Sequence, residues 1–496
     1  MLILHKAVAK HPYKPTKTTQ FMTLIDKKYY INAGAGGTYK QSGNYYTTPA
    51  ETENIIKFLD ENDIERLIVY FHGGLVSESS GMNSAERMMI QFADASANGK
   101  RHVVSFVWET GPVETLLQNL DTLAGKSLFK EAAKFAIKLA AKKLGLKDAK
   151  GTGEYLSDET INQERLKSAP FEYLDKDMDG GKGGESLNID NDDPDNSEFF
   201  ARLKADSRAL ISNEGSEEFK YGNIEGSEDS KGFLSIAVTV AKIAFAVLKR
   251  YVKQTHHDFY PTIMEETFRE IYIADIGNWG WSQMKNKAQK MFDSNDGRTG
   301  VNLYTGMHFL TLLDAHTKKR KEQGKKFDIE LIGHSAGSIA ICNMLTTTAK
   351  NFDNLRYNTV FFLAPACRTD LFLETLDKTK DKNVFKSFKL FTMREEKEKE
   401  DHCIPFVYTH SLLYLVSGLF EDETDAKILG LHEQFKAQGR YAGFEELNRI
   451  NAFINSGKLV LSDDIGHLDE NMRCNSLKHG DFDNDTYTLT SILKSL

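Results

Sequence analysis

One stretch of the chain decides how it folds: Leu331-Ile332-Gly333-His334-Ser335-Ala336-Gly337-Ser338-Ile339-Ala340-Ile341. The apolar residues from Ile329 to Ile332 are typical of a buried strand, and the small and apolar residues after Gly337 are typical of a helix. Between them lies a Gly-x-Ser-x-Gly turn, whose glycines have no Cβ and let strand and helix approach closely around Ser335. The N-terminus of the helix would present free N–H groups to an anion that forms beside the serine. The pattern predicts a serine nucleophile on a strand-to-helix turn.

The bulk composition is that of a globular protein. The chain has 496 residues, of which 40% are hydrophobic and 27% charged, and its net charge of −8 argues against a general nucleic-acid-binding protein. The four cysteines are scattered and form no Cys-x-x-Cys pair, which argues against a zinc site or a disulfide framework. The apolar run at the N-terminus is too short for a signal peptide, and no apolar run reaches the roughly 18 residues of a membrane-spanning helix. We therefore expect a cytoplasmic protein with reduced thiols.

The pattern of apolar runs predicts an α/β domain that is split by a long insert. Continuous apolar runs over 66–71 and 102–108 are typical of parallel strands, and a hairpin is expected before them, over 21–32. Further strands are expected at 329–332, 357–364, 388–393 and 458–462, with a helix at 485–496. The expected organisation is two parts of one α/β domain, 1–112 and 299–496, around a mainly helical insert with an acidic loop, 113–298.

The insert carries two amphipathic segments whose role the sequence leaves open. Apolar residues fill 233–248, and five lysines with a spacing of four lie on one face of a helix expected over 124–144: Lys126, Lys130, Lys134, Lys138 and Lys142. In one interpretation the insert is a lid that lies on an anionic membrane and delivers lipid esters. In the other it is a cap that buries its apolar faces on the catalytic domain and leaves its lysines solvated. In both interpretations residues 233–282 shape the acyl pocket or its entrance.

Two other features of the insert suggest sites but are better explained without them. His256 and His257 are interpreted as a solvated surface pair. The segment Asp175-Lys-Asp177-Met-Asp179-Gly180 resembles the start of a calcium loop, but Ser186 occupies the position where a bidentate Glu is required. No metal site is therefore expected.

A serine nucleophile needs a base, an acid that orients the base, and donors for an oxyanion. His72-Gly73-Gly74-Leu75 follows a buried strand, so a backbone N–H there can face the serine turn, and the N–H of Ala336 is the matching donor. Two histidines beyond the last strand compete as base, His467 and His479. We favour His479, because it lies on a loop that leads into the terminal helix.

The acid is expected between the serine and the base. Asp401 is favoured, because Asp-His-Cys-Ile-Pro returns the chain to apolar structure after a run of charges. Three other carboxylates remain as alternatives: Glu395, Glu396 and Asp370.

The order Ser335, Asp401, His479, together with the His-Gly-Gly loop and the Gly-His-Ser-Ala-Gly turn, resembles the α/β-hydrolase superfamily and its bacterial lipase/esterase-like members. The resemblance covers residues 20–112 and 300–496. It implies an eight-stranded, mostly parallel sheet flanked by helices, with Ser335 as nucleophile, His479 as base and Asp401 as acid. The oxyanion hole would consist of the N–H groups of Gly74 or Leu75 and of Ala336. The insert departs from the family, since it follows the 102–108 strand rather than the strand after the serine helix.

The expected activity is hydrolysis of a carboxylic ester with an apolar acyl group, through an acyl-enzyme and without a cofactor. The expected partners are a small ester or lipid, with peripheral membrane contact through the insert and no nucleic acid. Two alternatives remain open. One is an amidase, peptidase or thioesterase with the same triad, and the other is a non-catalytic binding or regulatory module.

Overall fold

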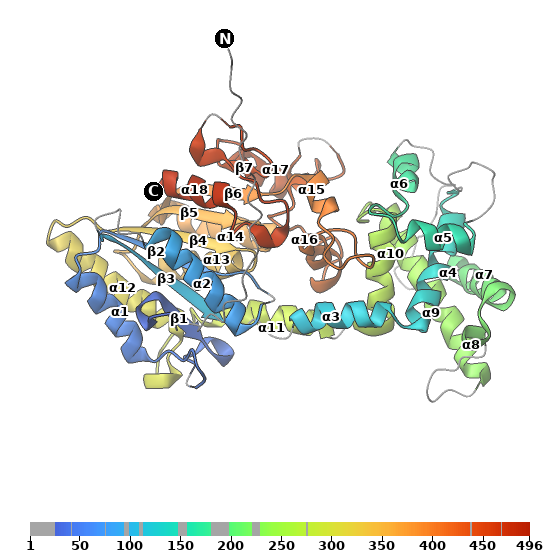
Figure 1. The fold of residues 1–496 in the computed structure, drawn as a ribbon, viewed down its shortest axis with the longest axis horizontal. Helices are drawn as coiled ribbons and strands as arrows, with labels where there is room; N and C mark the ends of the chain where they lie inside the picture. Colours follow the sequence, from blue (N-terminus) through green and yellow to red (C-terminus); the bar gives the residue numbers. More distant parts are fainter. Residues whose placement is uncertain are drawn as a thin grey trace, which may run out of the picture.

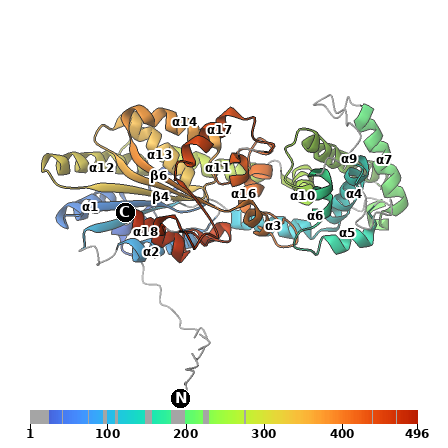
Figure 2. The same ribbon diagram turned by 90° about the horizontal axis from the view of Figure 1, so that it is seen from above.

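The computed structural model describes residues 25–40, 42–74, 76–93, 99–108, 113–146, 156–179, 198–220, 229–273, 276–436, 439–467 and 469–496. These residues form one parallel sheet covered by helices and, beside it, a lobe made of helices alone (Figure 1). Two helices, α3 (Val113–Ala124) and α11 (Ile276–Lys290), lie between the sheet and the lobe (Figure 2). Within the described ranges, no helix is both long enough and apolar enough to cross a membrane.

The sheet is parallel throughout. Its seven strands within the described residues lie in the order β1-β3-β2-β4-β5-β6-β7, and Val69 of the third strand in this order pairs with both Val104 and Leu331. The prediction of an α/β fold with a parallel sheet flanked by helices is confirmed, whereas the resemblance implied eight strands. The strands are β1 (Tyr30–Ala33), β2 (Arg66–Phe71), β3 (Arg101–Trp108), β4 (Asp328–His334), β5 (Tyr357–Leu363), β6 (Phe385–Thr392) and β7 (Leu459–Leu461).

Helices bury both faces of the sheet. Because side chains alternate along a strand, Leu67, Val69 and Phe71 pack in one core, and Ile68 and Tyr70 pack in another. The first core is closed by α1 (Pro49–Glu61), α12 (Thr305–Glu322), α13 (Gly337–Asn351), α14 (Thr369–Thr379) and α17 (Glu445–Ile454). The second is closed by α2 (Glu78–Phe92) and α18 (Thr486–Ser495). Burial on both faces explains why these strands are continuous apolar runs.

The hairpin expected over 21–32 is wrong for its described part. Residues 27–29 form a short 3₁₀ turn, in which the Asp26 side chain accepts a hydrogen bond from the N–H of Lys28 at 3.0 Å. Tyr30–Ala33 then pairs in parallel with β3. All four residues of β1 are buried, so this segment is a covered strand of the sheet rather than one arm of a local turn.

The insert forms a lobe with its own core. Phe129 of α4 packs against Phe268 of α10, with ring centroids 4.6 Å apart, and the apolar stretch 233–248 lies in the long helix α9. α4, α7, α9 and α10 contact one another, and α10 also contacts residues 416–420, so the expected burial of these helices against the α/β domain holds only in part. The helices of the lobe are α4 (Ser127–Lys143), α5 (Asp158–Glu164), α6 (Glu172–Asp179), α7 (Glu198–Glu214), α8 (Glu217–Lys220), α9 (Asp229–Val252) and α10 (Phe259–Phe268).

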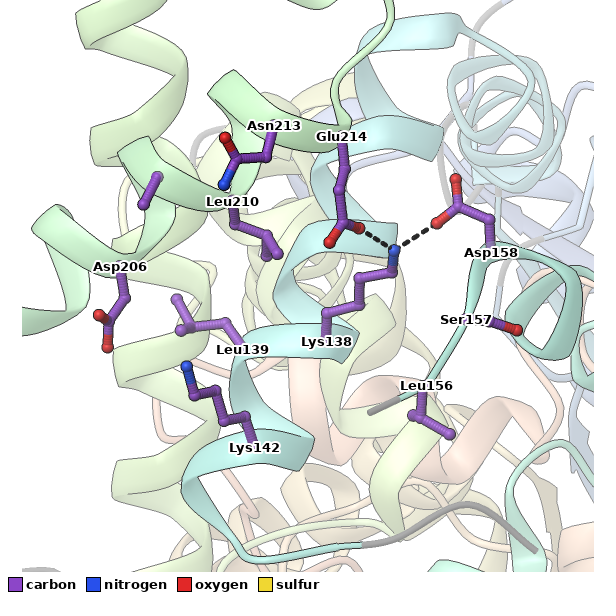
Figure 3. A pocket seen from close by; sticks show the side chains of 11 residues that line it. Lys138, Leu139, Lys142, Leu156, Ser157, Asp158, Asp206, Leu210, Asn213 and Glu214 are labelled. Carbon is purple, nitrogen blue, oxygen red and sulfur yellow. Dashed lines mark hydrogen bonds and ion pairs between the residues drawn. The ribbon is translucent and has the colours of Figure 1, made fainter. Parts of the chain in front are cut away.

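Two of the five spaced lysines are not solvated. The side chain of Lys138 is only 8% exposed and forms ion pairs with Asp158 and Glu214, which come from α5 and α7 (Figure 3). Lys134 pairs with Glu131 at 2.8 Å and with Asp158 at 3.2 Å. Lys138, Asp158 and Glu214 help to line a cavity of about 540 Å³ in the lobe. The lysines face other helices because the lobe folds back over this side of α4.

Asp175, which begins the calcium-like segment, lies in α6, and its carboxylate accepts a hydrogen bond from the N–H of Phe259 at 2.7 Å. A helix does not wrap around a cation as a calcium loop does, so the described part of this segment has the wrong backbone for that site.

Candidate active site

Ser335 stands on a strained turn between β4 and α13. Its φ angle is +50°, in the left-handed region that non-glycine residues rarely adopt. The turn is held by a hydrogen bond from the N–H of Ser335 to the carbonyl of Leu363 at 2.9 Å. A Cβ on Gly337 would lie 2.2 Å from the carbonyl oxygen of Phe71, so this position requires glycine. The close approach predicted for the glycines is therefore what places the serine at the carboxyl edge of the sheet.

His479 lies in hydrogen-bond contact with this serine. Its Nε2 is 2.9 Å from the Oγ of Ser335, and the residue occupies a short 3₁₀ turn just before α18. His334, the neighbour of the serine, donates from its own Nε2 to the carbonyl of His479 at 2.9 Å. The alternative base, His467, accepts a hydrogen bond from the N–H of Asp469 and makes no described contact with the serine.

Burial keeps the imidazole of His479 neutral. Burial, together with the neighbouring His334, lowers the pKa of His479 to about 3, while the carboxylate of Asp483 acts in the opposite direction. A neutral imidazole that accepts the Ser335 proton at Nε2 carries its own proton on Nδ1. This Nδ1 is buried and has no hydrogen-bond partner among the described residues. A buried donor without an acceptor is unfavourable by about 1–3 kcal/mol, so a nearby carboxylate would stabilise this arrangement.

Asp401 contacts the same histidine through the main chain. Its Oδ2 accepts the backbone N–H of His479 at 2.7 Å, and burial raises the pKa of the Asp401 carboxyl. The other carboxylates considered from the sequence have different partners. Glu395 pairs with Lys399 and Lys436, Asp370 pairs with Arg368, and Glu396 is exposed. Of the four, Asp401 is the one that the described contacts join to His479.

The glycine loop after β2 lies directly against the serine turn. A Cβ on Gly74 would be 2.9 Å from the Cβ of Ala336, and a Cβ on Gly73 would be 3.3 Å from the Cβ of Ser335. The N–H groups of Gly74 and Ala336 have no acceptor within the described part of the chain, so both remain available to an anion. Leu75, the alternative donor, lies outside the described residues.

His72 braces this loop. Its Nε2 accepts the N–H of Trp108 at 3.1 Å, which places its proton on Nδ1, where it is donated to the carbonyl of Gly73 at 2.6 Å. Burial lowers the pKa of His72 to about 4, so the ring is neutral and both of its nitrogens are occupied. His72 therefore positions the backbone of Gly73 and Gly74 and does not take the proton of Ser335.

Asp483 is a site residue that the sequence did not single out. Its Oδ2 accepts hydrogen bonds from the hydroxyl of Tyr70 at 2.8 Å and from Arg87 at 3.1 Å, and it lies 3.9 Å from Nδ1 of His334. Although burial acts to raise it, the charges of His334 and Arg87 lower the pKa of Asp483. The sequence feature that could have identified Asp483 is its position four residues beyond His479, in a segment rich in aspartate.

These residues surround a cavity of about 410 Å³ that opens beside Ser335. Its apolar lining comes from Val76, Leu117 of α3, Cys403 and Leu412. Among the described residues, none from 233–282 lines the cavity, so the expectation that this stretch shapes the acyl pocket is wrong for its described part, and a role at the pocket entrance stays a prediction. The physical reason is that α9 and α10 pack inside the lobe, whereas α3 reaches the sheet.

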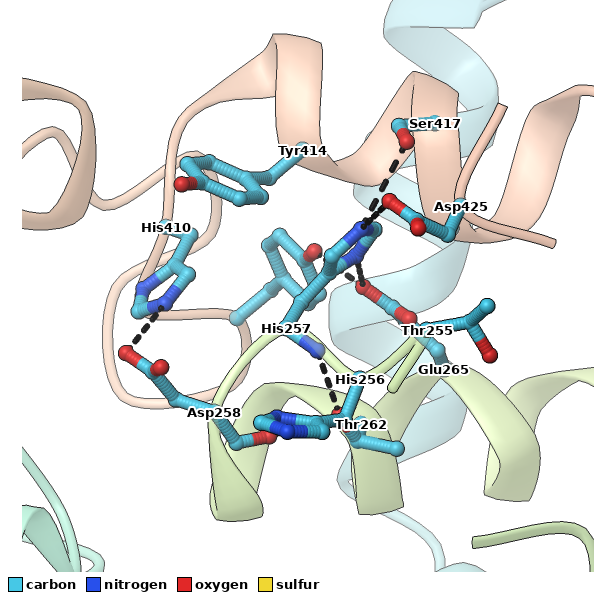
Figure 4. A network of polar contacts seen from close by, with 12 residues as sticks. Thr255, His256, His257, Asp258, Thr262, Glu265, His410, Tyr414, Ser417 and Asp425 are labelled. Atoms are coloured by element: carbon cyan, nitrogen blue, oxygen red, sulfur yellow. Dashed lines mark hydrogen bonds and ion pairs between the residues drawn. The ribbon is translucent and has the colours of Figure 1, made fainter. Parts of the chain in front are cut away.

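His257 is buried in a second polar network, where the insert meets the C-terminal part of the chain (Figure 4). Its Nδ1 lies 3.0 Å from Glu265, and its Nε2 lies 3.2 Å from Asp425. Burial opposes a charge on this ring, but the two carboxylates outweigh it and raise the pKa of His257. The expectation of a solvated histidine pair is therefore wrong, because His257 holds two carboxylates together in the interior.

This network includes a serine but offers it no substrate. The Oγ of Ser417 is 3.5 Å from Nε2 of His257, yet it donates to the carbonyl of Ala426 at 2.7 Å and is fully buried. Arg250 and Tyr408 also bind Glu265. The group is a structural junction between α9, α10 and the segment 406–441.

Comparison of the chain with protein-family models, curated proteins and solved structures finds no match. The assignment of a function therefore rests on the geometry of the site. A serine hydroxyl at a helix N-terminus, in contact with a neutral imidazole and beside two N–H groups that have no acceptor among the described residues, is suited to attack an electrophilic carbonyl carbon.

Proposed function

We propose that the protein is a serine hydrolase of the α/β-hydrolase type that cleaves carboxylic esters. The observation that carries the proposal is the 2.9 Å contact between Nε2 of His479 and Oγ of Ser335, made on a strained turn at the carboxyl edge of the sheet. Strain of this kind persists only where the surrounding structure enforces it, and it is common at nucleophiles.

In the first half of the reaction, Oγ of Ser335 attacks the ester carbonyl carbon while His479 Nε2 takes the hydroxyl proton. The carbonyl oxygen gains the negative charge and accepts hydrogen bonds from the N–H groups of Gly74 and Ala336. When the tetrahedral intermediate collapses, the imidazolium gives its proton to the departing alcohol oxygen, and the acyl group remains on the serine. In the second half, His479 takes a proton from water as the water attacks the acyl carbon, and it returns that proton to Oγ of Ser335 when the bond from Oγ to the acyl carbon breaks and the acid leaves.

The acid partner in this mechanism is Asp401. One oxygen of Asp401 accepts the backbone N–H of His479, and no described residue donates to the other oxygen. If that oxygen turned toward Nδ1 of His479, which has no hydrogen-bond partner among the described residues, it could accept the Nδ1 proton. The carboxylate would then hold the required tautomer and stabilise the imidazolium.

The topology supports the family assignment and also limits it. The nucleophile follows β4 in the middle of the sheet, the acid follows β6 and the base follows β7, which is the chain order of α/β-hydrolases. The described sheet departs from the family in its strand count and in the position of its insert.

The proposal is tested by labelling with a fluorophosphonate and by hydrolysis of p-nitrophenyl esters of increasing acyl length. Ser335→Ala should abolish labelling and reduce kcat/KM by about a thousandfold or more, since the variant lacks the nucleophile. Ser417→Ala is the matched control, because Ser417 also contacts a histidine but is sealed inside the junction. If the wild-type protein is not labelled, or Ser335→Ala is labelled as well as the wild type, the proposal of a serine hydrolase with Ser335 as nucleophile is wrong.

A further inference from the structure

The cavity beside Ser335 has one polar wall that comes from a single helix. Ser80, Asn83, Ser84 and Arg87 of α2 all line it, and their spacing of three and four residues places them on one face of that helix. We call these four residues the polar wall. A surface helix usually turns its polar face to bulk solvent, whereas this one turns polar groups toward a candidate nucleophile.

The polar wall offers hydrogen-bonding groups of both kinds. The amide of Asn83 has no hydrogen-bond partner among the described residues, and its side chain is exposed to the cavity. Among the described residues, the hydroxyl of Ser80 makes one hydrogen bond, with the hydroxyl of Ser77 at 3.0 Å. An amide and a hydroxyl each supply donors and acceptors, and so do the hydroxyl groups of a substrate. A wholly apolar ester would offer no hydrogen-bond partners to these groups.

The positive charge of Arg87, in the polar wall, is compensated by a carboxylate outside the wall. Arg87 donates from Nη2 to Ser84 at 2.8 Å and to the buried carboxylate of Asp483 at 3.1 Å. Its side chain is 42% exposed, and within the described residues its Nε and Nη1 make no hydrogen bond. An arginine already paired with a carboxylate attracts a second anion only weakly, but its remaining N–H groups can still donate to neutral oxygens.

The polar wall also flanks the side of the cavity from which an alcohol would depart. His479 must protonate the leaving oxygen, so the alcohol lies on the side of the imidazole. Arg87 is bound to Asp483, which lies 3.9 Å from His334, and His334 in turn donates to the carbonyl of His479. These contacts link the polar groups of α2 to the loop that carries His479, on whose side the alcohol would depart.

We propose that the polar wall recognises a hydroxyl-bearing alcohol group of the substrate, such as a glycerol or sugar moiety, joined to the acyl group. This inference rests on the proposed ester hydrolysis and narrows its substrate class. The expected substrate is then a polyol ester rather than a wholly apolar ester. The polar groups of the wall would form hydrogen bonds with the hydroxyl groups of its alcohol part.

The test compares two butyrate esters whose alcohols have three carbons, 1-monobutyrylglycerol and propyl butyrate. Release of butyrate should give a kcat/KM at least about tenfold higher for the glycerol ester, because a site built to bind hydroxyls discriminates against an analogue that lacks them. Asn83→Leu should reduce this ratio by about tenfold, while Glu86→Leu, at an exposed position on α2 outside the cavity lining, should leave the ratio unchanged.

Fluorophosphonate labelling separates the two proposals. If Ser335 is labelled but propyl butyrate is cleaved as well as the glycerol ester, or neither ester is cleaved, the polyol inference is wrong and the serine hydrolase remains. If butyryl glycolate, an anionic ester, is cleaved better than both, the wall selects carboxylates and the inference is also wrong. Absence of labelling removes the proposed function itself.

Discussion

The sheet region and the helical lobe use buried polar groups in different ways. Around Ser335, several polar side chains contact backbone atoms of the site, as when His72 holds the glycine loop and His334 holds the carbonyl of His479. In the lobe and at its junction, charged groups of opposite sign meet one another, as Lys138 meets Asp158 and Glu214. Polar groups of the first kind can prepare a reaction, whereas those of the second kind hold helices in place.

The histidines show the same contrast. His72 and His479 lie near the serine and are buried. Nearby carboxylates do not offset the effect of burial on the charged form of either ring, so burial lowers the pKa of each. His257, at the junction, lies between two carboxylates that raise its pKa. His479 can accept the Ser335 proton at Nε2, whereas both nitrogens of His72 are already occupied by hydrogen bonds. At the junction, Glu265 and Asp425 favour the charged form of His257. Burial alone therefore does not identify a catalytic histidine, because the partners of the ring decide its protonation.

The largest expected effect comes from replacing Asp401, one of the two carboxylates near His479. Asp401→Asn should lower kcat by about 10³–10⁴-fold, since an amide would favour the wrong tautomer of the imidazole. Asp483→Asn should have a smaller effect, because this carboxylate contacts Tyr70, Arg87 and His334 rather than the base. Steady-state kinetics on a p-nitrophenyl ester measures both. The reverse order would make Asp483 the acid partner.

The junction should lose stability when one of its carboxylates is removed. Glu265→Ala leaves Arg250 and His257 buried without this partner, and loss of one member of a buried ion pair costs about 3–5 kcal/mol. Urea denaturation would show this loss. Glu374→Ala, which removes an exposed partner of Lys378, is the control and should change stability by about 0–1 kcal/mol. Equal effects of the two variants would contradict the structural role of the network.

Acid should destabilise the sheet region through its neutral histidines. Burial lowers the pKa of His102 to about 4, below the ordinary value of about 6.5, and its Nε2 donates to the carbonyl of Lys28 at 2.9 Å. The unfolded chain then binds a proton that the folded chain does not, so stability falls as the pH drops from about 6.5 toward 4.

His102→Gln keeps a donor at this position but cannot titrate. Between about pH 6.5 and 4, the unfolding free energy of the wild type should fall as the pH falls. In the variant, the slope of this fall should be smaller by about 1.4 kcal/mol per pH unit. Chemical denaturation at pH 6.5, 5.5 and 4.5 measures the slope. A slope equal to that of the wild type would mean that His102 does not contribute. His257 should behave oppositely, because its raised pKa stabilises the fold at low pH and this contribution is lost as pH rises through that pKa.

The smallest effect is expected inside the lobe. Lys138→Met removes a cation whose carboxylate partners, Asp158 and Glu214, remain 48% and 45% exposed and can be solvated. The expected change in unfolding free energy is within about 1 kcal/mol, and ester hydrolysis should be unchanged. A loss of activity in this variant would mean that the charges of the lobe affect the reaction at Ser335 and do not only hold its helices in place.

The sequence was most informative where chemistry depends on local backbone geometry. Gly333, Ser335 and Gly337 could be placed because a strand-to-helix turn needs small residues at fixed positions, and His479 because it precedes the last helix. Asp483 and Arg87 could not be placed, since their pairing joins α2 to a loop almost four hundred residues later. His257 was misinterpreted for the same reason, because Asp425 comes from a distant segment.

The strand order has a consequence for synthesis of the chain. β2 ends at Phe71 and pairs with β4, which begins at Asp328, so roughly 250 residues separate two neighbours in the sheet. At a translation rate of about 5–20 residues per second, the edge of β2 would wait about 10–50 s on the ribosome for its partner. The lobe, whose helices contact near neighbours, can fold during this interval. An unpaired edge of this kind is an aggregation hazard, so the nascent chain should depend on chaperones until β4 emerges.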